Sequence, residues 1–247
     1  YYGNGNNNIQ IYNNDIYNID HGVVIGGWAA TVPASNIKIY NNHIHDYANW
    51  DTTSNAYHHD GIHAYATPPA KATDVWSYNN LFDGDVGQSI TAHIFMEGGS
   101  GAGSTPWTDS TGYAKIFNNV FISAKPINNG LLSYSMGTNT QIYNNAIMGI
   151  PATNDGVCVM IGSTSNVIFK NNIVTGCTNQ LVVAGGGGMT AAPGGWDKNV
   201  YANPGPFNAF VWWPTGLYTS NFLTWKNACN CDANSILNAS SGLDSTG

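Results

Sequence analysis

Histidine residues crowd the first part of this 247-residue chain, where their spacing could support proton transfer or metal binding. All seven lie at or before position 93, and residues 58–65 read His-His-Asp-Gly-Ile-His-Ala-Tyr. An imidazole titrates near neutral pH, so it can act as an acid, a base or a metal ligand, and a nearby carboxylate can orient it. The sequence therefore places its candidate chemistry around residues 58–65.

Two kinds of proton transfer fit this stretch and the segment that follows it. A carboxylate pair, Asp60 with Glu97 or with Asp46, could supply the acid and the base of glycoside hydrolysis. Alternatively, His63 with a tyrosine such as Tyr65 could abstract and donate protons in a β-elimination. The candidate catalytic residues are Asp60, His63, His93, Glu97 and Tyr65.

Metal binding and a purely structural role are the other interpretations. Imidazole nitrogens with a carboxylate suit Zn²⁺ or another transition metal, whereas a carboxylate site suits Ca²⁺. The sequence suggests these cofactors without specifying either. In the structural interpretation, histidine and aspartate side chains on a solvated face bond to loop backbone. The candidate metal ligands are His59, Asp60, His63 and His93.

Two long insertions flank the histidine-rich segment, and each carries a tryptophan. Residues 46–57 precede it and contain Trp50, whereas residues 97–113 follow the next apolar segment and contain Trp107. Long loops on a rigid scaffold often carry function, and exposed aromatic rings suit stacking against sugars. The candidate substrate-binding residues are His21, His59, Trp50, Trp107 and Tyr134.

A repeated motif indicates the scaffold that must position these residues. The pattern is apolar, aromatic, Asn, Asn, any residue, apolar, as in IYNNDI at residues 11–16 and IYNNHI at residues 39–44. The first Asn of each pair stands at positions 13, 41, 79, 118, 144 and 171, so successive repeats span 28, 38, 39, 26 and 27 residues. Asn tolerates left-handed backbone angles, and its copies in stacked repeats can bond to one another. We therefore expect an asparagine ladder along a stack of coils.

A second short segment lies between the asparagine pairs, usually a glycine followed by alternating apolar residues. Such alternation predicts a short strand with one face in the core. With Ile62 and Ala64 inside, His63 and Tyr65 face outward. We align Ile90 and Ala92 of the next coil with Ile62 and Ala64, and we treat the other coils in the same way. The expected neighbours on the outer face are then Asp60 beside His21 and Gln88, His63 beside Val24, Thr91 and Leu132, and Tyr65 beside His93 and Tyr134.

The V-x-I-x-N-N-x-F type repeat resembles the pectate-lyase-like superfamily of right-handed parallel β-helices, over residues 9 to about 201. The resemblance implies an all-β chain folded as a single-stranded right-handed parallel β-helix, a β-solenoid of about seven to eight coils. It also implies that the asparagine ladder lies between the second and third strands of each coil. The outer face of the first, glycine-led strand would then form the substrate groove. The family includes lyases, hydrolases, epimerases and phage tailspikes, so the fold alone does not fix an activity.

We expect a single domain across residues 1–247. It comprises an N-terminal lead-in at residues 1–8, coils at residues 9–201 and an irregular C-terminal cap region at residues 202–247, with residues 222–226 as the candidate cap. The four cysteines, at positions 158, 177, 229 and 231, allow three disulfide pairings, and the sequence does not choose among them.

Composition narrows the expected partners. The net charge is −7 and arginine is absent, so the chain lacks the basic cluster that nucleic acid binding requires. No apolar run reaches the roughly 20 residues of a membrane span. Lyases of this fold typically use arginine or lysine on acidic sugars, and the acidic triad with Gly-His-Gly and Arg-x-Lys of polygalacturonases is also missing. A neutral or weakly charged glycan is therefore the expected partner, unless Ca²⁺ assists a uronate.

The low charge and the abundance of Asn, Ser, Thr and Gly favour an extracellular protein, secreted or at the cell surface. The leading hypothesis is a β-helix that acts on extracellular polysaccharide as a glycoside hydrolase or a polysaccharide lyase, through its outer His/Asp cluster. The alternative is a non-catalytic β-solenoid that binds glycan, adheres or builds filaments. It would exist as a monomer or stack end to end through open coil ends.

Overall fold

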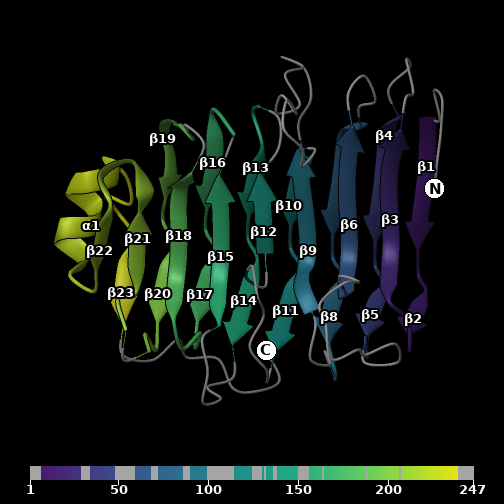
Figure 1. Ribbon diagram of the computed structural model, residues 1–247, viewed down its shortest axis with the longest axis horizontal. Helices are drawn as coiled ribbons and strands as arrows, with labels where there is room; N and C mark the ends of the chain where they lie inside the picture. Colours follow the sequence, from purple (N-terminus) through teal and green to yellow (C-terminus); the bar gives the residue numbers. More distant parts are fainter. Residues whose placement is uncertain are drawn as a thin grey trace.

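The computed structural model of the chain describes residues 7–28, 34–47, 59–67, 72–85, 90–98, 114–123, 130, 132–135, 138–149, 156–162, 164–186, 189–205 and 207–238. Nearly all of its elements are strands, arranged in long sheets, and α1 (Phe222–Cys229) lies at one end (Figure 1). The chain is all-β, as the repeat predicts. In the part of the chain that the structure describes, no helix has the length and apolar character to cross a membrane.

Three sheets run along the molecule. Sheet A consists of β3 (His21–Trp28), β6 (His59–Thr67), β9 (Ile90–Gly98), β12 (Leu132–Ser135), β15 (Val157–Gly162), β18 (Gln180–Gly186), β21 (Phe210–Trp212) and β22 (Leu217–Thr219). Sheet B consists of β1 (Asn7–Tyr12), β4 (Ala34–Tyr40), β7 (Ala72–Tyr78), β10 (Ala114–Phe117), β13 (Gln141–Tyr143), β16 (Val167–Lys170) and β19 (Ala191–Asp197). Sheet C consists of β2 (Asp15–Tyr17), β5 (His43–His45), β8 (Leu81–Asp83), β11 (Val120–Ser123), β14 (Ala146–Gly149), β17 (Ile173–Thr175), β20 (Val200–Ala202) and β23 (Ile236–Asn238).

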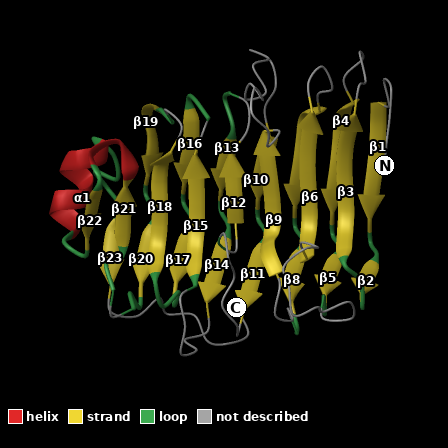
Figure 2. Ribbon diagram, in the orientation of Figure 1, coloured by secondary structure: helices red, strands yellow, loops and turns green. Residues whose placement is uncertain are grey.

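From β3 to β21 the chain visits sheets A, B and C in a fixed order (Figure 2). We call one such passage a coil. Each strand pairs in parallel with the strand at the same place in the next coil, and among the described strands only β21 and β22 pair antiparallel. This arrangement fits a β-solenoid. The asparagine pairs lie between the sheet B and sheet C strands of a coil, as the family resemblance implies.

The first asparagine of each pair turns the chain from sheet B into sheet C. Its backbone is left-handed, with φ of 56° at Asn41 and 55° at Asn118, and Lys198 holds φ of 60° at the corresponding place in a later coil. Asparagine adopts this conformation more readily than other non-glycine residues because its short side chain bonds locally. The backbone requirement explains why the motif repeats Asn at this position.

The second asparagine of each pair bonds to its copies in the neighbouring coils, and from Asn42 onward it is buried. The Oδ1 atom of Asn119 accepts from the backbone N–H of Asn80 at 3.1 Å and from its Nδ2 at 3.0 Å. The Nδ2 group of Asn119 donates to Asn145 Oδ1 at 3.1 Å and to the Ser77 carbonyl at 3.0 Å. The predicted asparagine ladder is confirmed, and it runs through Asn14, Asn42, Asn80, Asn119, Asn145, Asn172 and Asn199.

The interior is filled by the inward side chains of all three sheets. Sheet B keeps the predicted register, since Ile9 pairs with Ile37 and Ile11 with Ile39. Large residues that are fully buried in the core include Ile39, Ile44, Ile62, Phe82, Phe121 and Phe169. Burial of these apolar groups between neighbouring coils supplies stability that a single coil could not reach alone.

The stack extends past the predicted boundary at residue 201. Strand β21 adds to sheet A beside β18, and β23 adds to sheet C beside β20. Helix α1 lies between β22 and β23 in the chain, and it begins where the Asn221 side chain accepts a hydrogen bond from the Thr224 N–H. Trp225 of α1 is fully buried against Phe210 and Trp212, so residues 222–226 do pack on this end of the stack.

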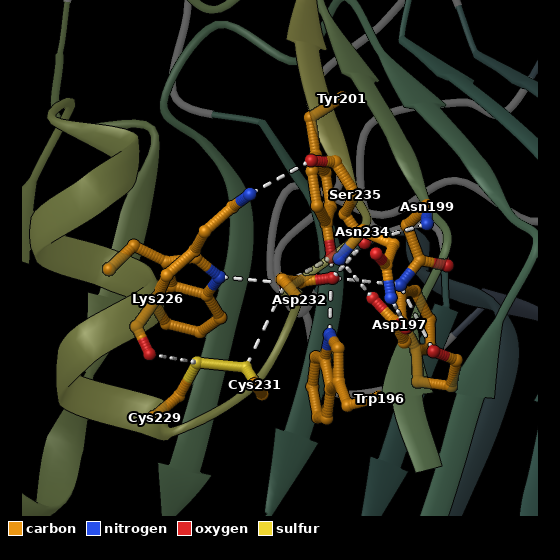
Figure 3. Close-up of a disulfide and its surroundings, with 12 residues drawn as sticks. Trp196, Asp197, Asn199, Tyr201, Lys226, Cys229, Cys231, Asp232, Asn234 and Ser235 are labelled. Carbon is orange, nitrogen blue, oxygen red and sulfur yellow. Dashed lines mark hydrogen bonds between the residues drawn. A yellow bond between two sulfur atoms is a disulfide. The ribbon is translucent and has the colours of Figure 1, made fainter. Parts of the chain in front are cut away.

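At the end of the ladder, Asp232 accepts the hydrogen bond that the next asparagine would accept (Figure 3). Its Oδ1 accepts from Asn199 Nδ2 at 3.1 Å, and its Oδ2 accepts from Trp225 Nε1 at 2.8 Å and from the Tyr201 hydroxyl at 3.0 Å. Burial raises the pKa of Asp232, against the opposing effect of these donors. The carboxylate therefore ties the last ladder asparagine to α1.

Two disulfides resolve the pairing that the sequence left open. Cys158 bonds to Cys177, and Cys229 bonds to Cys231 beside α1 (Figure 3). The first bridge joins β15 to the segment that follows β17. Disulfides persist in oxidising compartments, so both are compatible with a secreted protein.

Candidate functional site

A cluster of histidine and aspartate side chains lies where β3 and β6 begin in sheet A. His21 pairs in register with Asp60, and Val24 pairs with His63, as the sequence predicts. Because Ile62 and Ala64 are buried in the core, the intervening His63 points to the outer surface of the sheet. The two neighbouring coils thus bring their polar residues together on one face.

Asp60 sits at the centre of this cluster. Its Oδ1 accepts a hydrogen bond from the Ala92 N–H of the next coil at 3.0 Å. Its Oδ2 lies 3.5 Å from His21 Nε2 and 3.4 Å from His63 Nδ1. The two imidazole rings stack with centroids 5.4 Å apart and planes 15° apart. One buried carboxylate oxygen therefore faces two parallel imidazoles.

Asp20 extends the cluster on the far side of His21. Its Oδ2 lies 2.7 Å from His21 Nδ1, and its Oδ1 lies 2.7 Å from His59 Nδ1. His21 consequently has a carboxylate at each ring nitrogen. Burial lowers the pKa of His21, but contacts with Asp60 and Asp20 outweigh it and leave the pKa raised. The result is an imidazole that holds its proton more firmly than usual.

Exposure divides the cluster into an accessible and an inaccessible part. Asp60 is 0% exposed, and His59 and His63 are buried. The His21 side chain remains 19% exposed, and Asp20 is also reached by solvent. A molecule arriving at this face would therefore meet His21 and Asp20 directly, whereas Asp60 is out of its reach.

The same cluster is one of two described groups whose ligand atoms could surround a metal ion. One atom each of His21, Asp60 and His63 lie within 4.8 Å of one another. His59 contacts Asp20 instead of joining this group. Asp15, His43 and His45 form the second group, on sheet C.

His93 does not lie on the outer face, contrary to the predicted alignment. Ile62 pairs with Ile94 and not with Ile90, so His93 stands opposite Gly61 at the start of its strand. There the ring turns inward between sheets A and C and is fully buried against Phe82 and Phe121. Burial lowers the pKa of His93 to about 4, so the buried ring is neutral near pH 7.

The register also separates the proposed carboxylate pair. Asp60 pairs with Ala92, and Glu97 follows five residues later opposite Tyr65. At about 3.3 Å per residue, their backbones stand roughly 16 Å apart along the strands. Glycosidase carboxylates are about 5–9.5 Å apart, so this register does not favour Asp60 with Glu97 as acid and base. Asp46, the other suggested partner, bonds to His45 on sheet C.

Several predicted residues are placed only in part. Tyr134 pairs with Met96 and Ile161, one position away from the predicted alignment with Tyr65. Leu132 is likewise shifted, and it faces the core. The side chains of Tyr65, Glu97 and Tyr134 lie outside the described part of the structure, as do Trp50 and Trp107 with most of the two insertions.

Asp20 is the residue of this cluster that sequence reasoning missed. It stands immediately before His21, at the end of a turn, and nothing in the repeat singles it out. The only available signal was the adjacent pair of an aspartate and a histidine ahead of a predicted strand. Comparison with known proteins found no family model, curated protein or solved structure that matches this chain.

Proposed function

We propose that this chain acts on extracellular polysaccharide, as a glycoside hydrolase or a polysaccharide lyase, on the outer face of a right-handed parallel β-helix of about seven to eight coils. One observation supports the proposal above the others. The inaccessible carboxylate of Asp60 faces two stacked imidazoles, one of which reaches solvent. Such an arrangement can store and relay a proton.

The cluster suggests distinct roles for its members. His21 is the proton-transfer group, because it is partly exposed and a carboxylate faces each ring nitrogen. Asp60 is a positioning residue that fixes the orientation of His21 and His63, and it stabilises the charged form of His21. Asp20 holds the other nitrogen of His21. Such an imidazole can act as a general acid when it is protonated and as a general base when it is neutral.

A glycan is the favoured substrate because a long, regular sheet face suits a polymer, and because the net charge of −7 argues against nucleic acid. The chain has no arginine to neutralise acidic sugars. A neutral or weakly charged polysaccharide therefore fits the face best. Hydrolysis and elimination both need proton transfer to the departing oxygen, so the products distinguish between them.

The test is a panel of polysaccharides assayed for reducing ends and for the ultraviolet absorbance of unsaturated ends. His21→Ala should lower turnover by about 10²–10⁴-fold, the usual contribution of a general acid or base. Asp60→Asn should also lower turnover and move the pH profile toward acid, because His21 loses a carboxylate that raises its pKa. Met160→Ala, on the same sheet in β15, is the matched control. Unchanged turnover in His21→Ala would overturn the assignment.

A second candidate function is end-to-end assembly without catalysis. The β1–β2–β3 end of the described stack has an open hollow of about 670 Å³, lined partly by apolar residues such as Ile11, Ile16 and Val23. Tyr12 and Tyr17 are exposed at the same end. Concentration-dependent growth in light scattering, lost on Ile16→Asp, would favour assembly. Scattering that is independent of concentration would exclude it.

A further inference from the structure

The second histidine cluster lies on sheet C, away from the cluster proposed above to be catalytic. His43 and His45 are two residues apart in β5, with Ile44 fully buried between them. Alternation along a strand therefore puts both imidazoles on the outer surface. Their rings stack with centroids only 4.0 Å apart. A His-x-His pair on one strand face presents two nitrogen ligands side by side.

A carboxylate from the neighbouring coil meets this pair. Asp15 of β2 stands in register with His43. Its Oδ1 lies 2.9 Å from His45 Nε2 and 3.4 Å from His43 Nδ1. The same oxygen therefore approaches one nitrogen of each ring. Ligand atoms bound at about 2.0–2.2 Å in a tetrahedron are roughly 3.3 Å apart, which is close to this spacing.

The opposite nitrogen of each ring is held by a different carboxylate. His43 Nε2 lies 2.7 Å from Asp83 Oδ1, and His45 Nδ1 lies 2.6 Å from Asp46 Oδ2. If a metal ion replaces the proton between a ring and Asp15, the other ring nitrogen can still donate its N–H to the outer carboxylate. Carboxylates that accept from ligating histidines in this way are characteristic of protein metal sites.

We propose that Asp15, His43 and His45 bind a divalent transition metal ion such as Zn²⁺ or Cu²⁺. Asp46 and Asp83 orient the two rings, and water completes the coordination. Two imidazoles and one carboxylate suit these metals, whereas Ca²⁺ and Mg²⁺ prefer oxygen ligands alone. The charge also fits, because three carboxylates surround the two imidazoles and a dication offsets two of their three negative charges.

Access separates this site from the His21, Asp60 and His63 cluster. The side chains of His43 and Asp15 are 41% and 62% exposed, so a metal ion can enter with its remaining water. In the other cluster the central carboxylate is fully buried. A metal ion there would have to lose nearly all of its water, which makes the sheet C site the preferred one.

The experiment is calorimetric titration of metal-free protein with Zn²⁺ alone, repeated with Ca²⁺. We expect one Zn²⁺ per chain and no heat from Ca²⁺ at the same concentration. His45→Gln should abolish binding, Asp83→Asn should weaken it by about 10–100-fold, and His63→Gln should leave it unchanged. Circular dichroism of each variant verifies folding.

A spectroscopic measurement keeps the proposal testable if a variant misfolds. Electron paramagnetic resonance of the Cu²⁺-loaded protein should show coupling to two imidazole nitrogens, and to one in His43→Asn. Absence of Zn²⁺ binding, or binding lost in His63→Gln and kept in His45→Gln, would overturn the assignment. Neither result depends on whether the chain acts on polysaccharide.

Discussion

Substitution of a ladder asparagine should lower the free energy of unfolding by an amount that depends on its position in the stack. In Asn119→Ala, four hydrogen bonds disappear at once, two accepted by Oδ1 and two donated by Nδ2. The groups left behind on Asn80 and Ser77 are buried, so water cannot replace the lost partner. At about 1 kcal/mol for each net bond, the free energy of unfolding should fall by roughly 4 kcal/mol.

Asn14→Ala provides the matched control. Asn14 is the same residue type in the same motif, but it lies on the first described coil and is exposed. Its Nδ2 donates to the Tyr12 carbonyl and to Asn42 Oδ1. Tyr12 is exposed, and Asn42 Oδ1 still accepts from the Asn14 backbone N–H, so about 1 kcal/mol or less should be lost. Both substitutions remove the same side chain, but they differ in burial and in the number of bonds lost, which is two at Asn14 and four at Asn119.

The assay is urea denaturation followed by circular dichroism and by tryptophan fluorescence. Stability differences are taken from transition midpoints at a shared slope, which requires that both probes coincide. In a fold of stacked coils, the middle coils should unfold less readily than the end coils. Hydrogen exchange of the Asn80 amide therefore reports local unfolding around Asn119. Equal costs for the two substitutions would refute the view that buried ladder bonds stabilise the stack.

Three further predictions concern single positions. Lys198→Asn should raise stability by about 0.5–1 kcal/mol in urea denaturation, because asparagine suits the left-handed backbone at this position better than lysine does. His93 has a pKa of about 4 when folded and near 6.5 when unfolded, so the unfolded chain binds more protons between these values. Stability should therefore fall by about 2 kcal/mol from pH 7 to pH 5, and less in His93→Gln. Asp232→Asn should cost about 1–3 kcal/mol in thermal unfolding, because either amide orientation turns its NH₂ toward a donor such as Trp225 Nε1.

Sheet B and the ladder were predictable from sequence because the motif fixes them independently. The left-handed turn needs Asn, the buried ladder needs a second Asn, and the apolar residues before the pair alternate. These requirements locate each coil to the residue. Ile9 therefore pairs with Ile37 as expected, although loop lengths vary between coils.

Sheet A was less predictable because its segments carry no comparable marker. In the third coil, Ile90, Ala92, Ile94 and Met96 are all suitable inward residues. A slip of two or four residues preserves the alternation, so the pattern alone cannot set the pairing. In the structure Ile94 lies opposite Ile62, four residues beyond the predicted partner, and the register shifts between His59 and Asp60. Asp20 was missed for a related reason: it lies in a turn outside the motif, where residues of successive coils cannot be aligned from the sequence.

The corner where the strands of sheet A begin shows why residue type alone did not place the candidate histidines correctly. A Cβ at Gly61 would lie 2.5 Å from the His93 carbonyl oxygen and 2.7 Å from the Tyr47 hydroxyl, so this coil requires glycine at the corner. The next coil places His93 at the corresponding position, and its ring occupies the interior beside Phe82 and Phe121.

Three histidine environments follow from position within a coil. At the corner an imidazole is buried and neutral, as the lowered pKa of His93 shows. At the start of β3, His21 is partly exposed to solvent and lies between two carboxylates, and these carboxylates raise its pKa. On the outer face of β5, the His43 and His45 rings pair beside Asp15 in a geometry that suits a metal ion. Because one scaffold produces all three, an assignment of chemistry in such a chain depends on the pairing of the strands and not on the density of histidine in the sequence.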